Sequence, residues 1–402
     1  MSKSDPFNLK PSIITVYSTA WCPDCKRAKK FFGEHRVQYE TVDIEENTEG
    51  VAFVEKLNKG KRVIPTIIFP DGQILAEPSN AELASKLGLQ TKAEREFYDV
   101  IIVGGGPAGL TAAFYLAREG LEALVIEKAG LGGQAAITQV LDNFPGFDEG
   151  ISGAEFSDRL VRQARKFGVE LLQDQEVIEL EEDGLYHIVR SSSGDHYHSR
   201  AVLVASGAKY RRMEIPGEDE LIGINVHFCA TCDGTFYKGK KVLVIGGGNS
   251  GFEEGLFLTK FAIQVDIIVN TPEPKASKIL QDKVAEQKNM KVFLNHSIKE
   301  LTGKNKLESV VVEDKTTNEN KTLNYDGIFV FIGLTPNNDI LKETAKLDPW
   351  GFIKTEHMMT NIPGIFAAGD VRAGATKQAA AAVGEGASAA LAIREYLKSV
   401  GG

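Results

Sequence analysis

The sequence has few cysteines, no long apolar run and no excess of positive charge. No stretch approaches the ~20 apolar residues that a membrane-crossing helix needs, so we expect no membrane partner. The polar residues 1–11 lack the apolar core of a signal peptide, which predicts a cytoplasmic protein. A net charge of −9 argues against nucleic acid as the main partner. The seven histidines show no metal-ligand spacing, so we expect no metal site.

Glycine, in contrast, is abundant. The chain has 40 glycines in 402 residues, against a typical share of ~7%. Many are clustered, which favours tight turns between strands and helices that bind phosphate over disorder. A chain of 402 residues also exceeds what one hydrophobic core usually organises, so we expect two or three α/β domains.

The first ninety residues predict a small α/β unit. We expect the order β-α-β-α-β-β-α, with strands at 13–17, 37–42, 64–69 and 74–76 and helices at 26–34, 49–57 and 80–87. Cys22 and Cys25 then lie at a helix N-terminus, whose partial positive charge stabilises a thiolate. Cys22 is expected to be the exposed nucleophile and Cys25 the resolving thiol. Pro65 is expected in a cis turn beside them.

A dinucleotide-binding pattern occurs twice after residue 97. Each copy is a strand, 98–103 or 241–245, followed by a Gly-x-Gly-x-x-Gly turn. The first glycine permits the tight turn, the second lets a pyrophosphate approach the backbone, and the third lets helix and strand pack closely. The glycines are Gly104, Gly106 and Gly109 in the first copy and Gly246, Gly248 and Gly251 in the second. Two copies predict two dinucleotides.

The two copies differ at the end of their second strand. Glu127 is placed to accept hydrogen bonds from an adenosine ribose, whereas Val269 stands at the matching position of the second copy. Asn270 follows and can bind ribose hydroxyls, but no arginine is there for the 2′-phosphate of NADPH. The second site is therefore predicted to favour NADH, with an empty, degenerate site as the alternative.

A second Cys-x-x-Cys pair, Cys229 and Cys232, lies between the two glycine turns and is followed by Asp233. A dithiol can take two electrons from a reduced flavin, one thiolate reacting with the flavin and the other exchanging with a substrate. Asp233 can protonate the leaving thiolate. Half of a zinc site and an inert buried pair remain the alternatives.

Residues 98–402 resemble the low-molecular-weight thioredoxin reductases. The resemblance rests on Gly104-Gly-Gly-Pro-Ala-Gly109, Gly132-Gly-Gln134, Asn143-Phe-Pro-Gly146, Cys229-Ala-Thr-Cys-Asp233, Gly364-Ile-Phe-Ala-Ala-Gly-Asp370 and Lys377-Gln-Ala379. It implies that FAD is held by Glu127 and Asp370 and approached by Gln134, Asn143, Gln378 and Ala379. It also implies that Cys232 faces the flavin, Cys229 meets the disulfide substrate and Asp233 is the acid. A homodimer with a rotating nucleotide domain is expected.

Two further resemblances concern the N-terminal residues and the second nucleotide site. Residues 11–88 resemble a glutaredoxin, through Trp21-Cys-Pro-Asp-Cys25 and Ile64-Pro-Thr66. The segment 272–283 is similar to the NADH-using flavoprotein subunit of alkyl hydroperoxide reductase. The implied fold is a thioredoxin-like domain followed by two three-layer Rossmann-like domains. The implied ranges are 1–88 for the dithiol domain, 89–97 for a linker, 98–214 with 333–402 for the FAD domain and 215–332 for the NAD(P) domain.

The sequence thus predicts a disulfide reductase with a fused acceptor. Electrons pass from NAD(P)H through FAD and Cys229–Cys232 to Cys22–Cys25. The final acceptor is expected to be a peroxiredoxin, a thioredoxin-like protein, ribonucleotide reductase or a glutathione mixed disulfide. The alternatives are a thioredoxin reductase whose N-terminal domain is idle and a flavin-bearing redox sensor without turnover.

Overall fold

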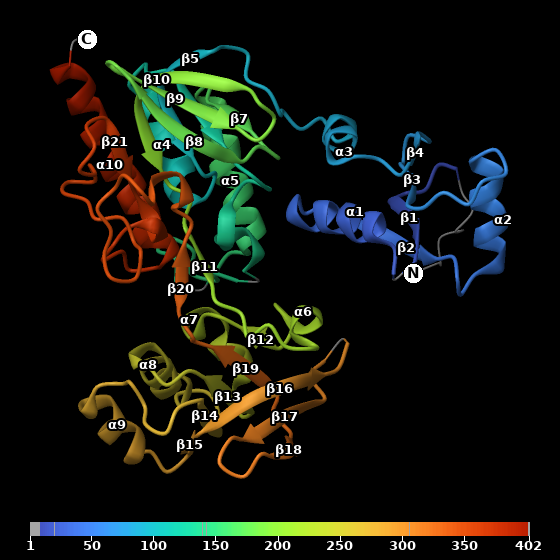
Figure 1. Cartoon of the computed structure of the whole chain (residues 1–402), viewed down its shortest axis with the longest axis vertical. Helices are drawn as coiled ribbons and strands as arrows, with labels where there is room; N and C mark the ends of the chain where they lie inside the picture. The colour runs from blue at the N-terminus through green and yellow to red at the C-terminus, as the bar shows by residue number, and fades with distance from the viewer. Residues whose placement is uncertain (1–8, 20, 139, 142, 305, 401–402) are drawn as a thin grey trace.

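The computed structural model describes residues 9–400, apart from positions 20, 139, 142 and 305 and the side chains of residues 48, 231 and 232. Figure 1 shows three units: a small N-terminal one, a large central one and a third that two chain segments join to the second. Within the described residues, no helix combines the length and the apolar character that crossing a membrane requires.

The N-terminal unit has the element order that the sequence predicts. Its elements are β1 (Ile14–Ser18), α1 (Pro23–Glu34), β2 (Tyr39–Asp43), α2 (Thr48–Leu57), β3 (Thr66–Ile68), β4 (Ile74–Ala76) and α3 (Asn80–Lys86). The sheet order is β2-β1-β3-β4, with β1 parallel to β2 and antiparallel to β3. The bulky side chains of Phe31, Phe32 and Leu83 fill the core between helices and sheet. The Ile64–Pro65 bond is cis, as predicted.

The central unit is built on a mostly parallel sheet of order β7-β6-β5-β10-β9-β8, with β21 beside β10. Its strands are β5 (Phe97–Val103), β6 (Ala123–Ile126), β7 (Glu170–Leu172), β8 (Val177–Asp183), β9 (Tyr186–Ser191), β10 (His196–Val204) and β21 (Ile365–Ala367). Its helices are α4 (Pro107–Arg118), η1 (Gly133–Ile137), α5 (Gly153–Lys166), η3 (Asp339–Leu341), η4 (Gly369–Val371) and α10 (Ala379–Ser399). Buried alanines on α4 and α10, such as Ala112 and Ala389, belong to one core that lets the two helices pack closely.

The third unit repeats the parallel design. Its five-stranded sheet has the order β12-β19-β13-β14-β15, and a three-stranded antiparallel sheet, β16-β17-β18, lies beside it. The strands are β12 (Val226–His227), β13 (Lys241–Ile245), β14 (Gln264–Val269), β15 (Met290–Leu294), β16 (His296–Thr302), β17 (Ser309–Asp314), β18 (Glu319–Leu323) and β19 (Gly327–Val330). The helices are α6 (Glu218–Leu221), α7 (Ala230–Asp233), η2 (Gly234–Tyr237), α8 (Asn249–Leu258) and α9 (Lys278–Ala285).

Two antiparallel strands, β11 (Ala208–Tyr210) and β20 (Leu334–Pro336), connect the central and third units. Beside them, the Asn337 side chain donates a hydrogen bond to the Ser206 carbonyl at 2.9 Å. The Ser206 hydroxyl donates in return to the Asn337 carbonyl. The two crossings are therefore held to each other by the β11–β20 pairing and by these two hydrogen bonds.

Candidate active site

In the first glycine turn, two glycines allow close backbone packing and a third faces open space. A Cβ on Gly104 would lie 2.4 Å from the Ala205 carbonyl oxygen, and one on Gly109 would lie 2.0 Å from the Gly104 oxygen. A Cβ on Gly106 would meet nothing closer than 3.9 Å. Gly106 is also the N-cap of α4 and has no side-chain cap, so helix N–H groups face this open space. This arrangement fits a pyrophosphate.

Glu127 closes the side of the same turn. Its carboxylate accepts hydrogen bonds from the Gly105 N–H at 2.7 Å and the Ala129 N–H at 3.0 Å. Burial raises the pKa of Glu127, while these backbone donors lower it. A carboxylate has about four acceptor positions, so both oxygens retain capacity for ribose hydroxyls.

The second glycine turn has the same geometry. A Cβ on Gly246 would lie 2.3 Å from the Phe331 oxygen, and one on Gly251 2.3 Å from the Gly246 oxygen. A Cβ on Gly248 would meet nothing within 4 Å. The residues present therefore fit a second pyrophosphate, which argues against a degenerate site.

A lysine near this second turn was missed by sequence reasoning. Lys315 Nζ lies 3.3 Å from the carbonyl oxygen of Asn270, which is exposed. Lys315 follows β17 and is distant from Asn270 in the sequence, so no local motif links the two. It places one cation beside Asn270, the residue that the sequence predicts to bind ribose hydroxyls.

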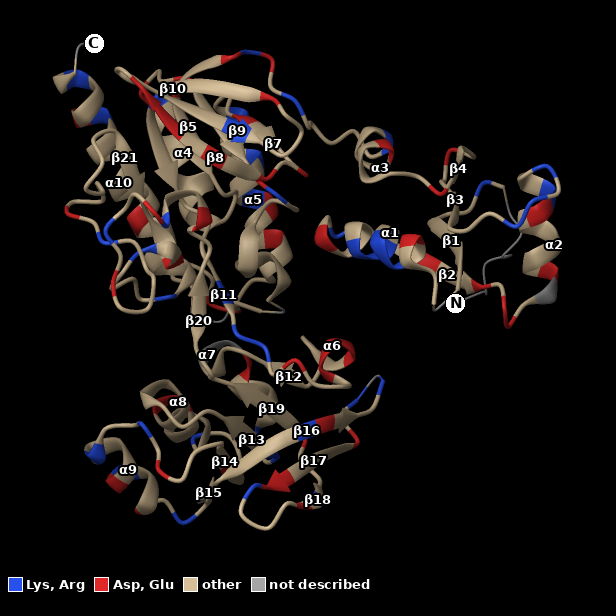
Figure 2. Cartoon of the chain, in the orientation of Figure 1, with Lys and Arg blue, Asp and Glu red and all other residues tan. Residues whose placement is uncertain are grey.

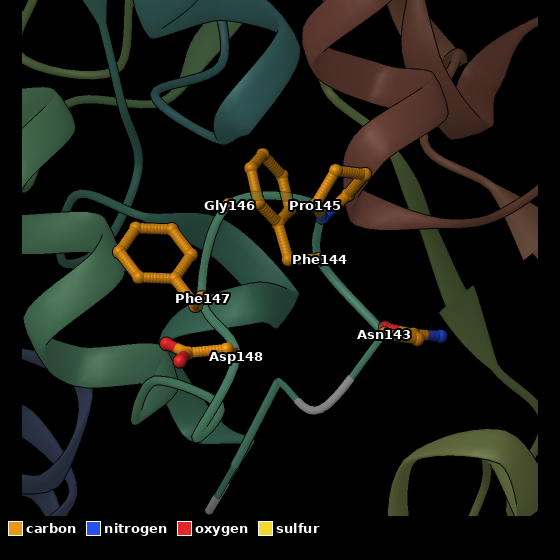
Figure 3. Close-up of a pocket in the computed structure, with 6 residues that line it drawn as sticks. All are labelled: Asn143, Phe144, Pro145, Gly146, Phe147 and Asp148. Atoms are coloured by element: carbon orange, nitrogen blue, oxygen red, sulfur yellow. The ribbon is translucent and has the colours of Figure 1, made fainter.

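The residues expected near the flavin partly come together. Asn143 Nδ2 donates a hydrogen bond of 3.0 Å to Gln378 Oε1, at the N-cap of α10, whose first residue is Ala379. Residues 143–148 line a hollow of about 450 Å³, with Asn143 at one end of the loop and Asp148 at the other (Figure 3). Gln134 lies in η1, whose first residue, Gly133, is against the Gly106 turn.

Asp370 lies in η4, before the N-terminus of α10. Burial raises its pKa, and the charge of Lys377 lowers it. The short helix is held by Glu385 of α10, which accepts from the Gly369 N–H at 2.8 Å and pairs with Arg372 at 2.6 Å. Sequence reasoning missed Glu385 and Arg372, because a salt bridge between a loop and the middle of a helix has no spacing signature.

The third unit carries Cys229 at the N-cap of α7, where it is disulfide-bonded. The backbone of Cys232 belongs to α7, and its side chain lies outside the described atoms. Asp233 ends the helix, and its Oδ2 lies 3.3 Å from Nδ1 of His227. His227 was missed by sequence reasoning, which considered the histidines only as metal ligands and found no such spacing.

Acidic groups of both nucleotide units surround Tyr210, which stacks on Phe228 with ring centroids 5.2 Å apart. Burial raises the pKa of Tyr210 to about 12, and the charges of Asp370, Glu254 and Asp233 raise it as well. Asp370 of the central unit and Asp233 of the third unit are thus both close enough to Tyr210 to act on its pKa through their charges.

The N-terminal dithiol is buried. Cys22 and Cys25 are free, with exposed fractions of 4% and 1%. Cys22 Sγ accepts from the Cys25 N–H at 3.1 Å and lies 3.8 Å from the Ile64 carbonyl. The expectation that Cys22 is exposed is therefore wrong, because the cis-proline loop covers its sulfur. Burial, together with the Cys22 hydrogen bond, raises the pKa of Cys25 to about 12, which fits a resolving thiol.

The structure does not bring the two cysteine pairs together. The C-terminal end of α1 contacts the central unit, where Arg36 pairs with Asp158 of α5 at 2.9 Å. A Cβ on Gly130 would also lie 2.2 Å from the Glu34 carbonyl oxygen. A helix of 12 residues is ~18 Å long. The N-terminal end of α1, which Cys22 caps, is therefore the end turned away from the central unit (Figure 1).

The family follows from these two turns and the cysteine pair beside them. Residues 98–386 match the model of the pyridine nucleotide-disulphide oxidoreductases. The chain belongs to this family. Residues 14–75 match the glutaredoxin model. Oxidoreductases of the thioredoxin reductase type use FAD and NAD(P)H, and the two open glycine turns fit both nucleotides.

Individual relatives of this oxidoreductase match about three quarters of the chain. It is 39% identical to thioredoxin reductase of Bacillus subtilis over 312 residues, 77% of the chain and 97% of the relative. It is 39% identical to the bifunctional thioredoxin reductase/thioredoxin of Mycobacterium leprae over 308 residues, 76% of the chain and 67% of the relative. The crystal structure of thioredoxin reductase from Streptococcus pyogenes is 37% identical, with a TM-score of 0.71 over 76% of the chain and 99% of that structure.

Proposed function

We propose that this oxidoreductase passes electrons from NADH to Cys229–Cys232, then to its own Cys22–Cys25 pair, and from there to a protein disulfide. FAD, held by the first glycine turn, Glu127 and Asp370, would carry the electron pair from the nicotinamide to the first disulfide. The observation that carries the proposal is the presence, in one chain, of two dithiols that each begin a helix, beside two open nucleotide turns.

The exchange between the pairs needs only the four sulfurs. The Cys229 thiolate attacks Cys22 of an oxidised Cys22–Cys25 pair and releases the Cys25 thiolate. Cys25 then takes a proton, because its pKa of about 12 disfavours the anion. Cys232 attacks Cys229 and releases Cys22, so one disulfide is broken and one is formed. The fused acceptor raises the effective concentration of the second dithiol, up to the millimolar range.

The acceptor is proposed to be a thioredoxin-like protein or a peroxiredoxin, with a glutathione mixed disulfide as a smaller substrate. The bifunctional relative joins a thioredoxin reductase to a thioredoxin, which supports a fused dithiol as a working acceptor. Exposed Trp21, whose Nε1 donates to Glu45 at 2.9 Å, is next to Cys22 and offers an apolar contact to a partner.

A double variant tests the transfer step. Cys25→Ser with Cys232→Ser leaves Cys22 and Cys229 as the two cysteines of the chain. Mild oxidation should join them, and mass spectrometry of peptides would identify the Cys22–Cys229 disulfide. A non-reducing gel would show whether the bond lies within one chain or joins two. The matched control, Cys22→Ser with Cys232→Ser, leaves Cys25, which should crosslink far less because it lies inside α1 behind residue 22 at the N-cap. Absence of the bond in the first variant contradicts the relay.

Weakening the contact between the N-terminal unit and α5 is expected to make the relay faster. We propose that the N-terminal unit must leave α5 for Cys22 to reach Cys229. Arg36 and Asp158 are 27% and 50% exposed, and such pairs contribute ~0.2–1 kcal/mol. Arg36→Glu should therefore raise the rate of Cys22–Cys25 reduction up to about fivefold, as measured by stopped flow with NADH. Asp158→Arg should act alike, and the double charge swap should restore the original rate. Equal rates in all variants would show that docking does not limit transfer.

Nucleotide selectivity is proposed to favour NADH. Val269 packs on the turn, since a Cβ on Gly247 would lie 2.5 Å from its Cγ1, and no arginine follows it. Replacing Asn270 and Thr271 with arginine supplies two charged donors for a 2′-phosphate. Each such bond contributes ~1.5–3 kcal/mol, so KM for NADPH should fall at least about tenfold relative to KM for NADH. A wild-type chain that already prefers NADPH, with Lys315→Ala removing the preference, would refute this proposal.

A further inference from the structure

A buried histidine lies directly behind the acid of the second cysteine pair. His227, on β12, is 6% exposed and precedes Cys229 by two residues. Its ring packs against Phe329 of β19 and Tyr237 of η2, with centroids 5.3 and 5.4 Å away. A histidine enclosed by aromatic rings has lost its water shell, so its two nitrogens must be satisfied by protein groups.

Both nitrogens have partners, and one partner is Asp233. Nε2 lies 2.7 Å from the Tyr237 hydroxyl, and Nδ1 lies 3.3 Å from Asp233 Oδ2. Burial raises the pKa of Tyr237 to about 12, so its hydroxyl stays protonated near neutral pH and can donate to Nε2. The imidazole then carries its proton on Nδ1, which faces the Asp233 carboxylate at 3.3 Å. The contacts thus lead from the tyrosine hydroxyl through the histidine ring to the aspartate carboxylate.

The backbone leaves room for this arrangement. A Cβ on Gly327, the first residue of β19, would lie 2.2 Å from Cε1 and 2.6 Å from the hydroxyl of Tyr237. Any other residue at 327 would push the ring away from His227. Asn225 Nδ2 approaches the same hydroxyl at 3.5 Å.

We propose that His227 is a positioning residue that holds the Asp233 carboxylate in place for proton transfer during exchange at Cys229–Cys232. The inference rests on the proposed function. Reduction of the disulfide breaks one S–S bond and needs two electrons and two protons to give two thiols. NADH supplies the electron pair and one proton as hydride, and Asp233 supplies the second proton to a thiolate. In the forward exchange, the carboxylate takes a proton back from the attacking thiol.

Few other charges face this group among the described residues. Lys240 lies over the Tyr237 ring, 5.4 Å from its centroid, and Asp326 acts on the Tyr237 pKa through its charge. Glu254 of α8 accepts a hydrogen bond from the Ala230 backbone, and burial raises its pKa. Phe329 brings no charge. Asp233 and Tyr237 are thus the titratable groups in direct contact with His227.

The test compares His227→Leu with His227→Asn in the FAD-loaded full chain that also carries Cys22→Ser. Turnover of an aromatic disulfide, dithiobis(nitrobenzoate), by NADH is followed at neutral pH. Leucine removes the ring nitrogen that faces the Asp233 carboxylate, so kcat should fall by up to about 100-fold while KM for the disulfide changes little. Asparagine keeps a polar donor near the Nδ1 position and should restore most of the original kcat.

Tyr237→Phe provides a second measurement that does not depend on folding of the leucine variant. It keeps the ring beside Gly327 and removes the hydroxyl that orients His227, so kcat should fall in the same way by a smaller factor. An unchanged kcat in both His227→Leu and Tyr237→Phe overturns the role of His227. No NADH-dependent turnover in the unaltered His227 background instead contradicts the proposed function.

Discussion

Replacing Cys22 with serine is expected to lower NADH-dependent reduction of a protein disulfide by at least ~100-fold, because a hydroxyl cannot take the place of the attacking thiolate. Reduction of the flavin by NADH should keep its wild-type rate, since both glycine turns lie in other units. Stopped-flow absorbance of the flavin and steady-state NADH consumption with a thioredoxin-like acceptor measure the two steps separately.

The same variant distinguishes the alternatives. If the N-terminal domain is idle, Cys229 serves the acceptor directly and Cys22→Ser keeps full activity. If the chain is a redox sensor, neither the variant nor the wild type turns over. A useful control is Cys25→Ser, which should trap the acceptor as a mixed disulfide with Cys22, because the resolving thiol is gone.

Gly106→Val is expected to give a folded protein without yellow colour, retaining less than about a tenth of the FAD of the wild type. A Cβ at Gly106 meets no protein atom closer than 3.9 Å, so the fold tolerates it, but the side chain occupies the space in front of α4. Absorbance at the flavin band and circular dichroism measure the two effects.

Two further glycines provide controls for the substitution in the first glycine turn. Gly33→Ala, also with no neighbour within 4 Å but on α1, should keep the colour. Gly248→Val should keep FAD but lose reduction by NADH, because it fills the second turn. A yellow, fully reducible Gly106→Val protein would show that FAD does not lie at the first turn.

The order of elements in the N-terminal unit follows from sequence because its signals are local. The alternation of apolar residues, Pro23 at the first turn of α1 and the Asp71-Gly72 turn are all read within a few residues. The two glycine turns are equally local, and the spacing from Gly104 to Gly109 reflects one close contact between a helix and a strand.

Other features depend on contacts that no local pattern records. Arg36 meets Asp158 only because the N-terminal unit docks on α5, and Lys315 reaches Asn270 only through the turn after β17. Cys22 has the motif of an exposed nucleophile, yet Ile64 covers it. No local pattern distinguishes His227 from the other histidines, and only the fold places it against Asp233 and Tyr237.

The most direct test of the relay is a count of thiols after anaerobic reduction. The oxidised full-length protein, loaded with FAD and mixed with excess NADH, is quenched with an alkylating reagent and analysed by peptide mass spectrometry. The relay predicts that all four cysteines are alkylated, and that in Cys229→Ser the Cys22–Cys25 pair stays oxidised. A wild-type protein in which Cys229 and Cys232 are alkylated while Cys22 and Cys25 remain joined would contradict it.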